Sequence, residues 1–292
     1  MKKKAIIYIV LAGLLWGTSG LFVNILSPFG FSSVQLTAVR GVISALIMTV
    51  YVLIYDRRLF KINLPQLVLC FFCGLTLFVT AASYYSSMKA CSVSTAVTLM
   101  YTAPVFVMAF SVVYWKEKLS AIKIVSIVAM LVGCALVSGI VGDFKFSLAG
   151  FGFGVLSGLS YGTYSVFTKL QYIRGTNPLT ATVYAFYFMA IISTVVCNPV
   201  EAVGFIAADP LKILPLFLAF GACTFVIPYF LYNLSLGDLP ASVASALSII
   251  EPLAATVYSI VLLGEQLTIF SILGIVLILG SVFLISRGEK NE

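Results

Sequence analysis

Residues 104–119, PVFVMAFSVVYWKEKL, share one pattern with residues 252–267, PLAATVYSIVLLGEQL, and this repeat points to the architecture of the chain. Each stretch begins with a proline, continues through an apolar run and ends with a glutamate that stands two residues before a leucine. The two prolines are as far apart in the chain as the two glutamates. This shared spacing predicts that the two halves of the chain are copies of one unit.

A second match lies nearer the start of each half. Trp16-Gly17-Thr18 corresponds to Tyr161-Gly162-Thr163, at nearly the same separation as the proline stretches. Two matches in register indicate a duplication, with a first copy over residues 1–141 and a second over residues 148–292. A duplication that serves structure alone is the alternative.

The composition shows which solvent these copies meet. Of 292 residues, 61% are hydrophobic and only 9% are charged, and the mean hydropathy is +1.13. A soluble domain carries about a quarter charged residues because its surface faces water. The chain is therefore neither a soluble globule, nor a disordered chain, nor a coiled coil. We expect an integral membrane protein in a lipid bilayer.

Apolar segments recur along the whole chain, and each is close to the roughly 20 residues that cross a bilayer as a helix. The start, Met1-Lys-Lys-Lys, resembles a signal peptide, but the apolar run continues to Leu26 without a cleavage site, so we interpret it as a retained first helix. The ten predicted spans are residues 5–26, 34–55, 66–88, 94–115, 121–141, 148–169, 178–198, 211–232, 241–262 and 268–286.

Five spans per copy is an odd number, so the second copy must enter the membrane upside down relative to the first. Inverted repeats of this kind form many secondary transporters, with the binding site near the midplane. The predicted fold class is an all-α integral membrane protein. Its ten transmembrane helices form 5+5 inverted-topology repeats around a central cavity.

The basic residues orient these spans. Most lysines and arginines fall on the side of the N-terminus, whereas Lys89, Lys145 and Lys212 fall on the other side. By the positive-inside rule both termini are cytoplasmic. The short basic start and compact loops are typical of a multi-pass protein of a bacterial inner membrane. The basic residues form no single patch, so we expect no nucleic-acid partner.

The sequence lacks the residues that several kinds of protein chemistry require. Cys70-Phe-Phe-Cys73 has the spacing of a metal site, but no second pair follows and the chain has no histidine, so we expect neither a metal nor another cofactor. The sequence has no phosphate-binding Gly-Lys motif and no large soluble domain that would let ATP drive it. A single deep carboxylate cannot form a catalytic constellation, so we do not expect an enzyme. We also do not expect a sensor or scaffold, because such a protein would normally show a receptor domain or a signalling tail, and neither is found in this sequence.

The chain resembles the EamA-type branch of the drug/metabolite transporter superfamily over essentially all ten segments. The residues that carry the resemblance are Trp16-Gly17, the proline run that ends at Glu117, and the Glu251-Pro252 run that ends at Glu265. The resemblance implies 5+5 inverted repeats, alternating access, and a cavity lined mainly by the first, third, fourth, sixth, eighth and ninth helices. Similar proteins mostly export amino acids and other small metabolites, and some import.

Glu251 is the sharpest functional signal. It lies near the middle of the segment 241–262, where an ionised carboxylate costs on the order of 2.5–3.5 kcal/mol. Such a group faces a cavity or a partner, and it could bind a proton or the ammonium group of a substrate. The alternative is a structural carboxylate that bonds to backbone released by Pro252.

Two prolines stand at equivalent positions inside predicted helices. Pro104 and Pro252 each remove an amide donor and free the carbonyl four residues earlier, at Met100 and Ser248. Freed backbone at membrane depth is tolerated where it is buried in protein or lines a wet cavity. The prolines could form kinks that assist gating, or static bends that shape packing.

Aromatic and polar side chains supply the candidate walls of the cavity. Trp16 and Asn24 share one face of the first segment, and Tyr258 shares a face with Glu251. Tyrosine and tryptophan seek polar partners and attract cations through their ring faces. An interfacial belt or plain packing is the alternative for each tyrosine. The predicted substrate-binding residues are Glu251, Trp16, Tyr84, Tyr101, Tyr161, Tyr232, Tyr258 and Asn24.

Two basic residues have open roles. Arg40 lies about two turns into the second segment, so its head could extend to the outer surface, pair helices, or bind a substrate carboxylate. Lys169 ends the sixth segment and could anchor the topology or gate the cavity, like Asn24 at the equivalent place in the first repeat.

These residues predict a secondary active transporter that exports an amino acid or related amine, with proton coupling possible through Glu251. The alternative is an importer of a quaternary ammonium or polyamine-type cation that uses an aromatic cage and Glu251. A zwitterion also needs a donor for its carboxylate, so a cavity without a basic or amide donor would favour the cation. The expected partners are the small-molecule substrate, protons and the lipid bilayer. A monomer is the expected state, with a dimer as the alternative.

Overall fold

The computed structural model describes residues 2–90, 93–118, 120–137, 147–197, 199–263 and 268–291, and every regular element in these ranges is a helix. The α-helices are α1 Lys2–Gly17, α2 Ser19–Leu26, α3 Ser33–Tyr55, α4 Leu64–Ala90, α5 Val93–Met100, α6 Ala103–Trp115, α7 Ala121–Val137, α8 Leu148–Ile173, α9 Pro178–Cys197, α10 Val200–Ala208, α11 Pro210–Gly221, α12 Ile227–Asp238, α13 Ala241–Leu247, α14 Ile250–Leu263 and α15 Ile269–Asn291. Two short 3₁₀ helices, η1 Ser27–Phe29 and η2 Arg57–Phe60, and one π-helical turn, η3 Ala222–Val226, complete them.

Six helical stretches of the described chain are long and apolar enough to cross a membrane. They are Lys3–Leu26, Val34–Tyr55, Leu64–Ser87, Ala96–Trp115, Pro178–Cys197 and Pro210–Asp238. Three shorter apolar helices lie within Ala121–Leu136, Ala241–Ala255 and Ile272–Ser281. The all-helical membrane architecture is therefore confirmed.

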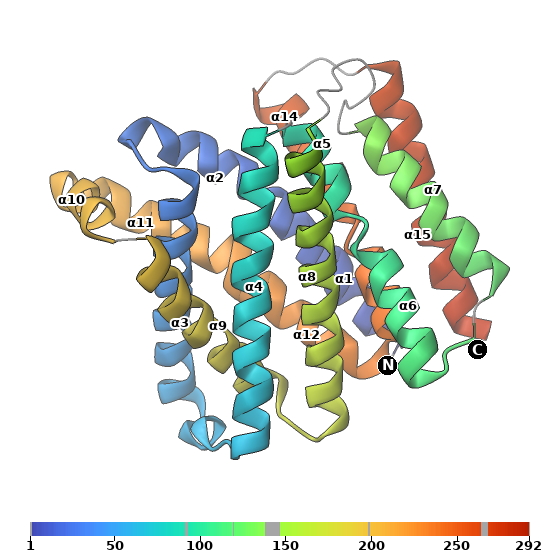
Figure 1. Ribbon diagram of the computed structural model, residues 1–292, viewed down its shortest axis with the longest axis horizontal. Helices are drawn as coiled ribbons and strands as arrows, with labels where there is room; N and C mark the ends of the chain where they lie inside the picture. Colours follow the sequence, from blue (N-terminus) through green and yellow to red (C-terminus); the bar gives the residue numbers. More distant parts are fainter. Residues whose placement is uncertain are drawn as a thin grey trace.

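The sixth predicted span, α8, is long but rich in glycine and hydroxyl side chains. Most of these residues are buried, and the helix packs against α4, α5 and α6. A helix that faces other helices rather than lipid can carry such residues, because small side chains let backbones approach closely. Figure 1 shows α8 beside α4 in the middle of the molecule, with α7 and α15 paired on one side and α3 and α10 on the other.

Two of the predicted spans are interrupted just before a repeated proline. Residues 94–115 form α5 and α6, which are separated at Tyr101 and Thr102, and residues 241–262 form α13 and α14, which are separated at Ser248 and Ile249. Each break lies just before a repeated proline. Both prolines therefore stand in the first turn of a new helix, where a missing amide donor costs nothing.

The predicted mid-helix position of Pro104 and Pro252 is thus wrong, because each proline follows a two-residue interruption of the helix, and their role in gating or bending stays a prediction. The expected free carbonyl of Ser248 is also not free, because it accepts a hydrogen bond of 3.1 Å from the backbone amide of Glu251. This bond spans three residues rather than four, which is the tighter pairing that helix ends adopt. The chain restarts its hydrogen bonding at the break instead of leaving it open.

Glycines bring helices from the two halves into close contact. A Cβ atom on Gly17 of α1 would lie 2.7 Å from Ala254 Cβ and 2.9 Å from the amide nitrogen of Ala255, both on α14. A Cβ atom on Gly158 of α8 would lie 2.9 Å from the carbonyl oxygen of Leu99 on α5. Each half therefore packs its first long helix against the broken helix of the other half.

One end of the bundle collects basic residues. The N- and C-termini both lie in the lower half of Figure 1, where α4 begins and α8 ends. Arg57 and Arg58 in η2, Lys116 after α6 and Arg174 after α8 flank helix ends on this side. We call it the basic end.

Candidate functional site

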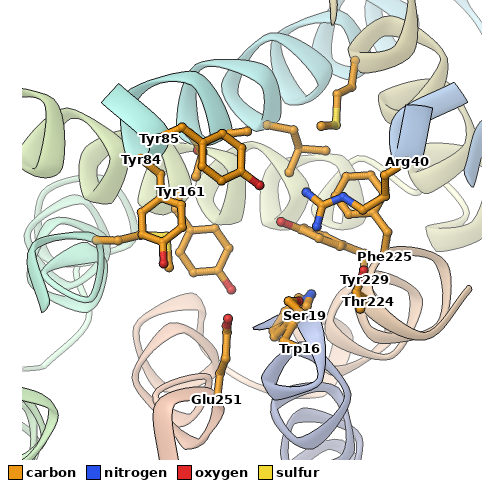
Figure 2. A pocket seen from close by; sticks show the side chains of 15 residues that line it. Trp16, Ser19, Arg40, Tyr84, Tyr85, Tyr161, Thr224, Phe225, Tyr229 and Glu251 are labelled. Atoms are coloured by element: carbon orange, nitrogen blue, oxygen red, sulfur yellow. The ribbon is translucent and has the colours of Figure 1, made fainter. Parts of the chain in front are cut away.

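A cavity of about 140 Å³ lies where the two broken helices face α1, α3, α4, α8 and α12. Its wall mixes aromatic rings, hydroxyl groups and two charged side chains, as Figure 2 shows. The lining residues are Trp16, Ser19, Arg40, Leu77, Thr80, Ala81, Tyr84, Tyr85, Met100, Tyr161, Met189, Thr224, Phe225, Tyr229 and Glu251.

Glu251 enters this wall at the start of α14, directly after the helix break. The positive end of a helix dipole favours a carboxylate in the first turn, which helps to explain how a charge is tolerated at this depth. Tyr84 and Tyr101 are electrostatic neighbours of the carboxylate. Among the described residues Glu251 forms no ion pair, and the Tyr101 hydroxyl is its hydrogen-bonding neighbour, so the carboxylate lines the cavity without a basic partner in contact.

Arg40 enters the same wall from α3. Its guanidinium carbon lies 4.8 Å from the ring centroid of Phe225 and 5.3 Å from that of Phe220. Its Nε atom is buried and has no hydrogen-bond partner in the described chain. The head therefore lies over aromatic rings in the cavity and does not extend to the outer surface. A cation in this position is held by ring faces and is not neutralised by an acid.

Trp16 is the centre of the aromatic wall. Its ring centroid lies 5.1 Å from that of Tyr229, 5.7 Å from that of Tyr232 and 6.4 Å from that of Tyr161. Trp16 and Tyr161 stand at matching places in the two halves, and here their rings meet edge to face. The cavity wall thus joins residues that the sequence places far apart.

The predicted binding residues divide into three groups. Trp16, Tyr84, Tyr161 and Glu251 line the cavity. Tyr101 and Tyr232 are buried behind the wall: the Tyr101 hydroxyl lies beside the Glu251 carboxylate, and the Tyr232 hydroxyl lies 2.6 Å from that of Ser165.

Tyr258 and Asn24 lie outside the cavity wall. The Tyr258 hydroxyl donates to the carbonyl oxygen of Leu14 at 3.2 Å, and Asn24 is exposed on α2. Tyr258 and Asn24 were predicted because they share helix faces with Glu251 and Trp16. Residues on one face can still contact different neighbouring helices at successive turns, so only some of them reach the cavity.

Sequence reasoning missed several wall residues, including Tyr229, Tyr85, Thr224 and Ser19. Tyr229 could have been found, because it precedes the predicted Tyr232 by three residues and so shares its helix face. No sequence signal distinguishes Thr224 or Ser19 from the other hydroxyl residues of the chain.

Lys169 lies toward the basic end and does not line the cavity. Its Nζ atom donates to the carbonyl oxygens of Leu236 at 2.6 Å and Leu239 at 3.0 Å. These carbonyls close the C-terminal end of α12, where a cation is favoured. Glu117 and Asp238 are acidic groups that act on it electrostatically.

Further hydrogen bonds join the helices between the cavity and the basic end. The Tyr164 hydroxyl donates to Asn233 Oδ1 at 3.0 Å, and Asn233 Nδ2 donates to Thr182 Oγ1 at 2.7 Å. After α6, Glu117 accepts a bond of 2.6 Å from Ser242 of α13. These bonds and the capping bonds of Lys169 join α6 and α8 to α12 and α13. We call this set the closed half.

The cysteine pair belongs to a buried cluster. Cys70 Sγ lies 3.2 Å from Gln171 Oε1, and Gln171 Nε2 lies 3.1 Å from Cys73 Sγ. Among the residues that the structure describes, no group of three or more His, Cys, Asp or Glu side chains could hold a metal ion.

The EamA-like transporter family matches the chain twice, over residues 3–139 and 148–287. A Clostridium kluyveri protein named as an uncharacterized transporter is 26% identical over 302 residues, which cover 99% of this chain and 95% of the relative. The Salmonella typhimurium protein YicL, named as an uncharacterized inner membrane transporter, is 24% identical, with 99% and 97% covered. Bacillus subtilis YwfM, also named as an uncharacterized transporter, is 25% identical, with 98% and 95% covered.

The fold is also found among solved structures. One crystal structure superposes with a TM-score of 0.81 at 18% sequence identity and covers 100% of this chain and 99% of its own. This likeness concerns the fold alone.

Proposed function

Because the chain belongs to the EamA-like transporter family, we propose that it is a secondary active transporter that moves a small organic metabolite across the cytoplasmic membrane by alternating access. The observation that carries this proposal is the cavity, which holds the carboxylate of Glu251 between aromatic side chains. A buried ionisable group at membrane depth is costly, and its usual reason is a substrate or ion pathway.

We further propose that the transporter is built from two inverted five-helix repeats, residues 1–141 and 148–292, with ten spans in total. The double family match supports this division. The packing of Gly17 against α14 and of Gly158 against α5 supports it too, because a pseudo-twofold arrangement exchanges such contacts. Ten helices provide a complete path in one chain, so a monomer is the proposed state.

The proposed cargo carries an ammonium group, as an amino acid or related amine does. Glu251 would bind the ammonium group and the rings would cover the apolar part of the ligand. Export is the proposed direction, and Glu251 is the proposed proton carrier if the transport is coupled to protons. An importer of quaternary ammonium or polyamine-type cations would use the same residues. Arg40 opposes that alternative, because a guanidinium in the wall repels a ligand with only positive charge.

The proposed orientation places both termini and the basic end in the cytoplasm. Arg57, Arg58, Lys116 and Arg174 on the side of the termini support it through the positive-inside rule. The relative named as an inner membrane transporter supports the location. In this orientation the closed half lies between the cavity and the cytoplasm.

Flux into proteoliposomes tests the proposal. Purified protein is first screened for thermal stabilisation by amino acids, amines and quaternary ammonium compounds, since a ligand of the folded state raises its stability. Each hit is then measured as a radiolabelled substrate, with and without a pH gradient. Saturable uptake above that of empty vesicles is the expected result. If no hit in the screen is transported in any gradient, the proposal fails.

A further inference from the structure

We propose that Arg40 and Glu251 are the two charged poles of one binding site, and that the ligand is a zwitterion with its carboxylate at Arg40 and its ammonium group at Glu251. This inference rests on the proposed function and narrows its substrate class. The two residues enter the cavity from α3 and α14, which lie in different halves of the chain. Figure 2 shows both side chains reaching into the cavity, with aromatic rings around them.

The state of Arg40 points to an anionic ligand. Its guanidinium rests on the rings of Phe220 and Phe225, and its buried Nε–H has no acceptor in the described chain. A buried donor without a partner destabilises the protein, and more so when the group is charged. A structural arginine would be expected to have an acidic partner, and Arg40 has none here. The planar guanidinium fork matches a carboxylate through two parallel hydrogen bonds.

The state of Glu251 points to a cationic group on the same ligand. Glu251 and Arg40 line one cavity and influence each other electrostatically, yet they form no ion pair. If Arg40 served only to neutralise Glu251, the two side chains would be expected to meet. Arg40 lies on the aromatic rings and Glu251 lies at the start of α14 beside Tyr101, so neither charge is neutralised by an ion pair.

Charge balance then selects the ligand. A simple amine would satisfy Glu251 and leave Arg40 without an acceptor, whereas a simple carboxylate would satisfy Arg40 and leave Glu251 without a donor. Both remaining charges would be poorly solvated inside the protein, which is costly. A zwitterion satisfies both poles and brings no net charge into the cavity. The hydroxyl groups of Ser19, Thr80 and Thr224 in the wall offer further polar contacts.

Three ligands that share one phenylethyl group test this assignment. Phenylalanine has both charged groups, 2-phenylethylamine lacks the carboxylate, and 3-phenylpropionate lacks the amine. Binding of each to the purified full-length protein is measured by calorimetry. The leucine series, with 3-methylbutylamine and 4-methylpentanoate, repeats the measurement with an aliphatic chain. In at least one series the zwitterion should bind about tenfold or more tightly than either partial ligand, since a charge-assisted hydrogen bond has this order of strength.

Substitutions of Arg40 and Glu251 test which residue binds the carboxylate of the ligand and which binds its ammonium group. Arg40→Gln should remove the advantage of the amino acid over the amine and leave the affinity for the amine unchanged or higher. Glu251→Gln should remove the advantage over the carboxylate in the same way. Arg58→Gln, which changes an exposed arginine of the basic end, is the matched control and should leave all affinities unchanged.

The outcomes separate this inference from the proposed function. If the wild-type protein binds either partial ligand as tightly as the zwitterion, the inference is overturned, and this comparison needs no variant to fold. The same holds if none of the six compounds binds, or if Arg40→Gln weakens the amine as much as the amino acid. If a quaternary ammonium compound is then transported, the proposed transport function stands and only the zwitterion assignment falls.

Discussion

The cavity and the closed half contain similar polar residues, but they use them in opposite ways. In the closed half, Tyr164 and Asn233 are hydrogen-bonded to each other, and Lys169 donates to two carbonyl oxygens. In the cavity, Arg40 and Glu251 have no ion-pair partner among the described residues. Polar groups that are satisfied within the protein stabilise one conformation, whereas groups left open are available to a ligand. The comparison separates residues that hold the protein closed from residues that bind.

The largest expected effect is the loss of transport when the charge of Glu251 is removed from the cavity. Glu251→Gln keeps the shape of the side chain but removes its charge, so flux of the substrate found in the screen should fall at least about tenfold. Radiolabel uptake into proteoliposomes measures it. Glu201→Gln, on the exposed helix α10, is the matched control and should transport normally. Equal flux in the Glu251 variant and the wild type would remove Glu251 from the site.

A smaller effect is expected where the two halves pack together. Gly17→Ala would place a methyl group 2.9 Å from the backbone of α14, and overpacking of this kind costs about 1–3 kcal/mol. Thermal unfolding in detergent should show the variant to be less stable than the wild type. Gly20→Ala, three residues further along the chain, meets nothing within 4 Å and should not be destabilised. Similar melting temperatures for both variants would contradict the close contact.

The closed half should respond in stability rather than in binding. Tyr164→Phe removes the hydroxyl that donates to Asn233, which should cost about 0.5–1.5 kcal/mol of folding free energy. Ligand affinity should change less than twofold, because Tyr164 is not in the cavity wall. Calorimetry and thermal unfolding of one preparation measure both quantities. A large loss of affinity at unchanged stability would place Tyr164 in the binding machinery.

The smallest effect is expected for Tyr258→Phe and Asn24→Ala. Tyr258 donates one exposed hydrogen bond to Leu14, and Asn24 is exposed on α2. Neither lines the cavity, so flux in proteoliposomes should stay within about twofold of the wild type. Tyr161→Phe, which changes a wall residue by the same single oxygen, is the contrasting variant. A severe loss with Tyr258→Phe would show that the cavity of another conformation includes this residue.

Part of the site could be predicted because a few residues are of types that are energetically unfavourable in an apolar segment unless they have a function. Glu251 is a carboxylate inside an apolar segment, and Trp16 and Tyr161 lie at matching positions of the two sequence repeats. The direction of the Arg40 side chain could not be predicted, since a long side chain two turns into a helix can reach the surface, a partner helix or a cavity. Its position depends on Phe220 and Phe225, which lie far away in the sequence.

Composition and spacing are enough to predict the lipid environment, the helical architecture and the duplication of this chain. Hydropathy and spacing are local properties, and backbone in lipid must form its hydrogen bonds within helices or closed barrels. The breaks in the proline-containing spans, and the place of Glu251 at the start of α14, became visible in the folded protein alone. The tertiary packing also sets which tyrosines face the cavity and that Arg40 shares it with Glu251. These features depend on which helices meet across the two halves, and such contacts join residues that no local pattern relates.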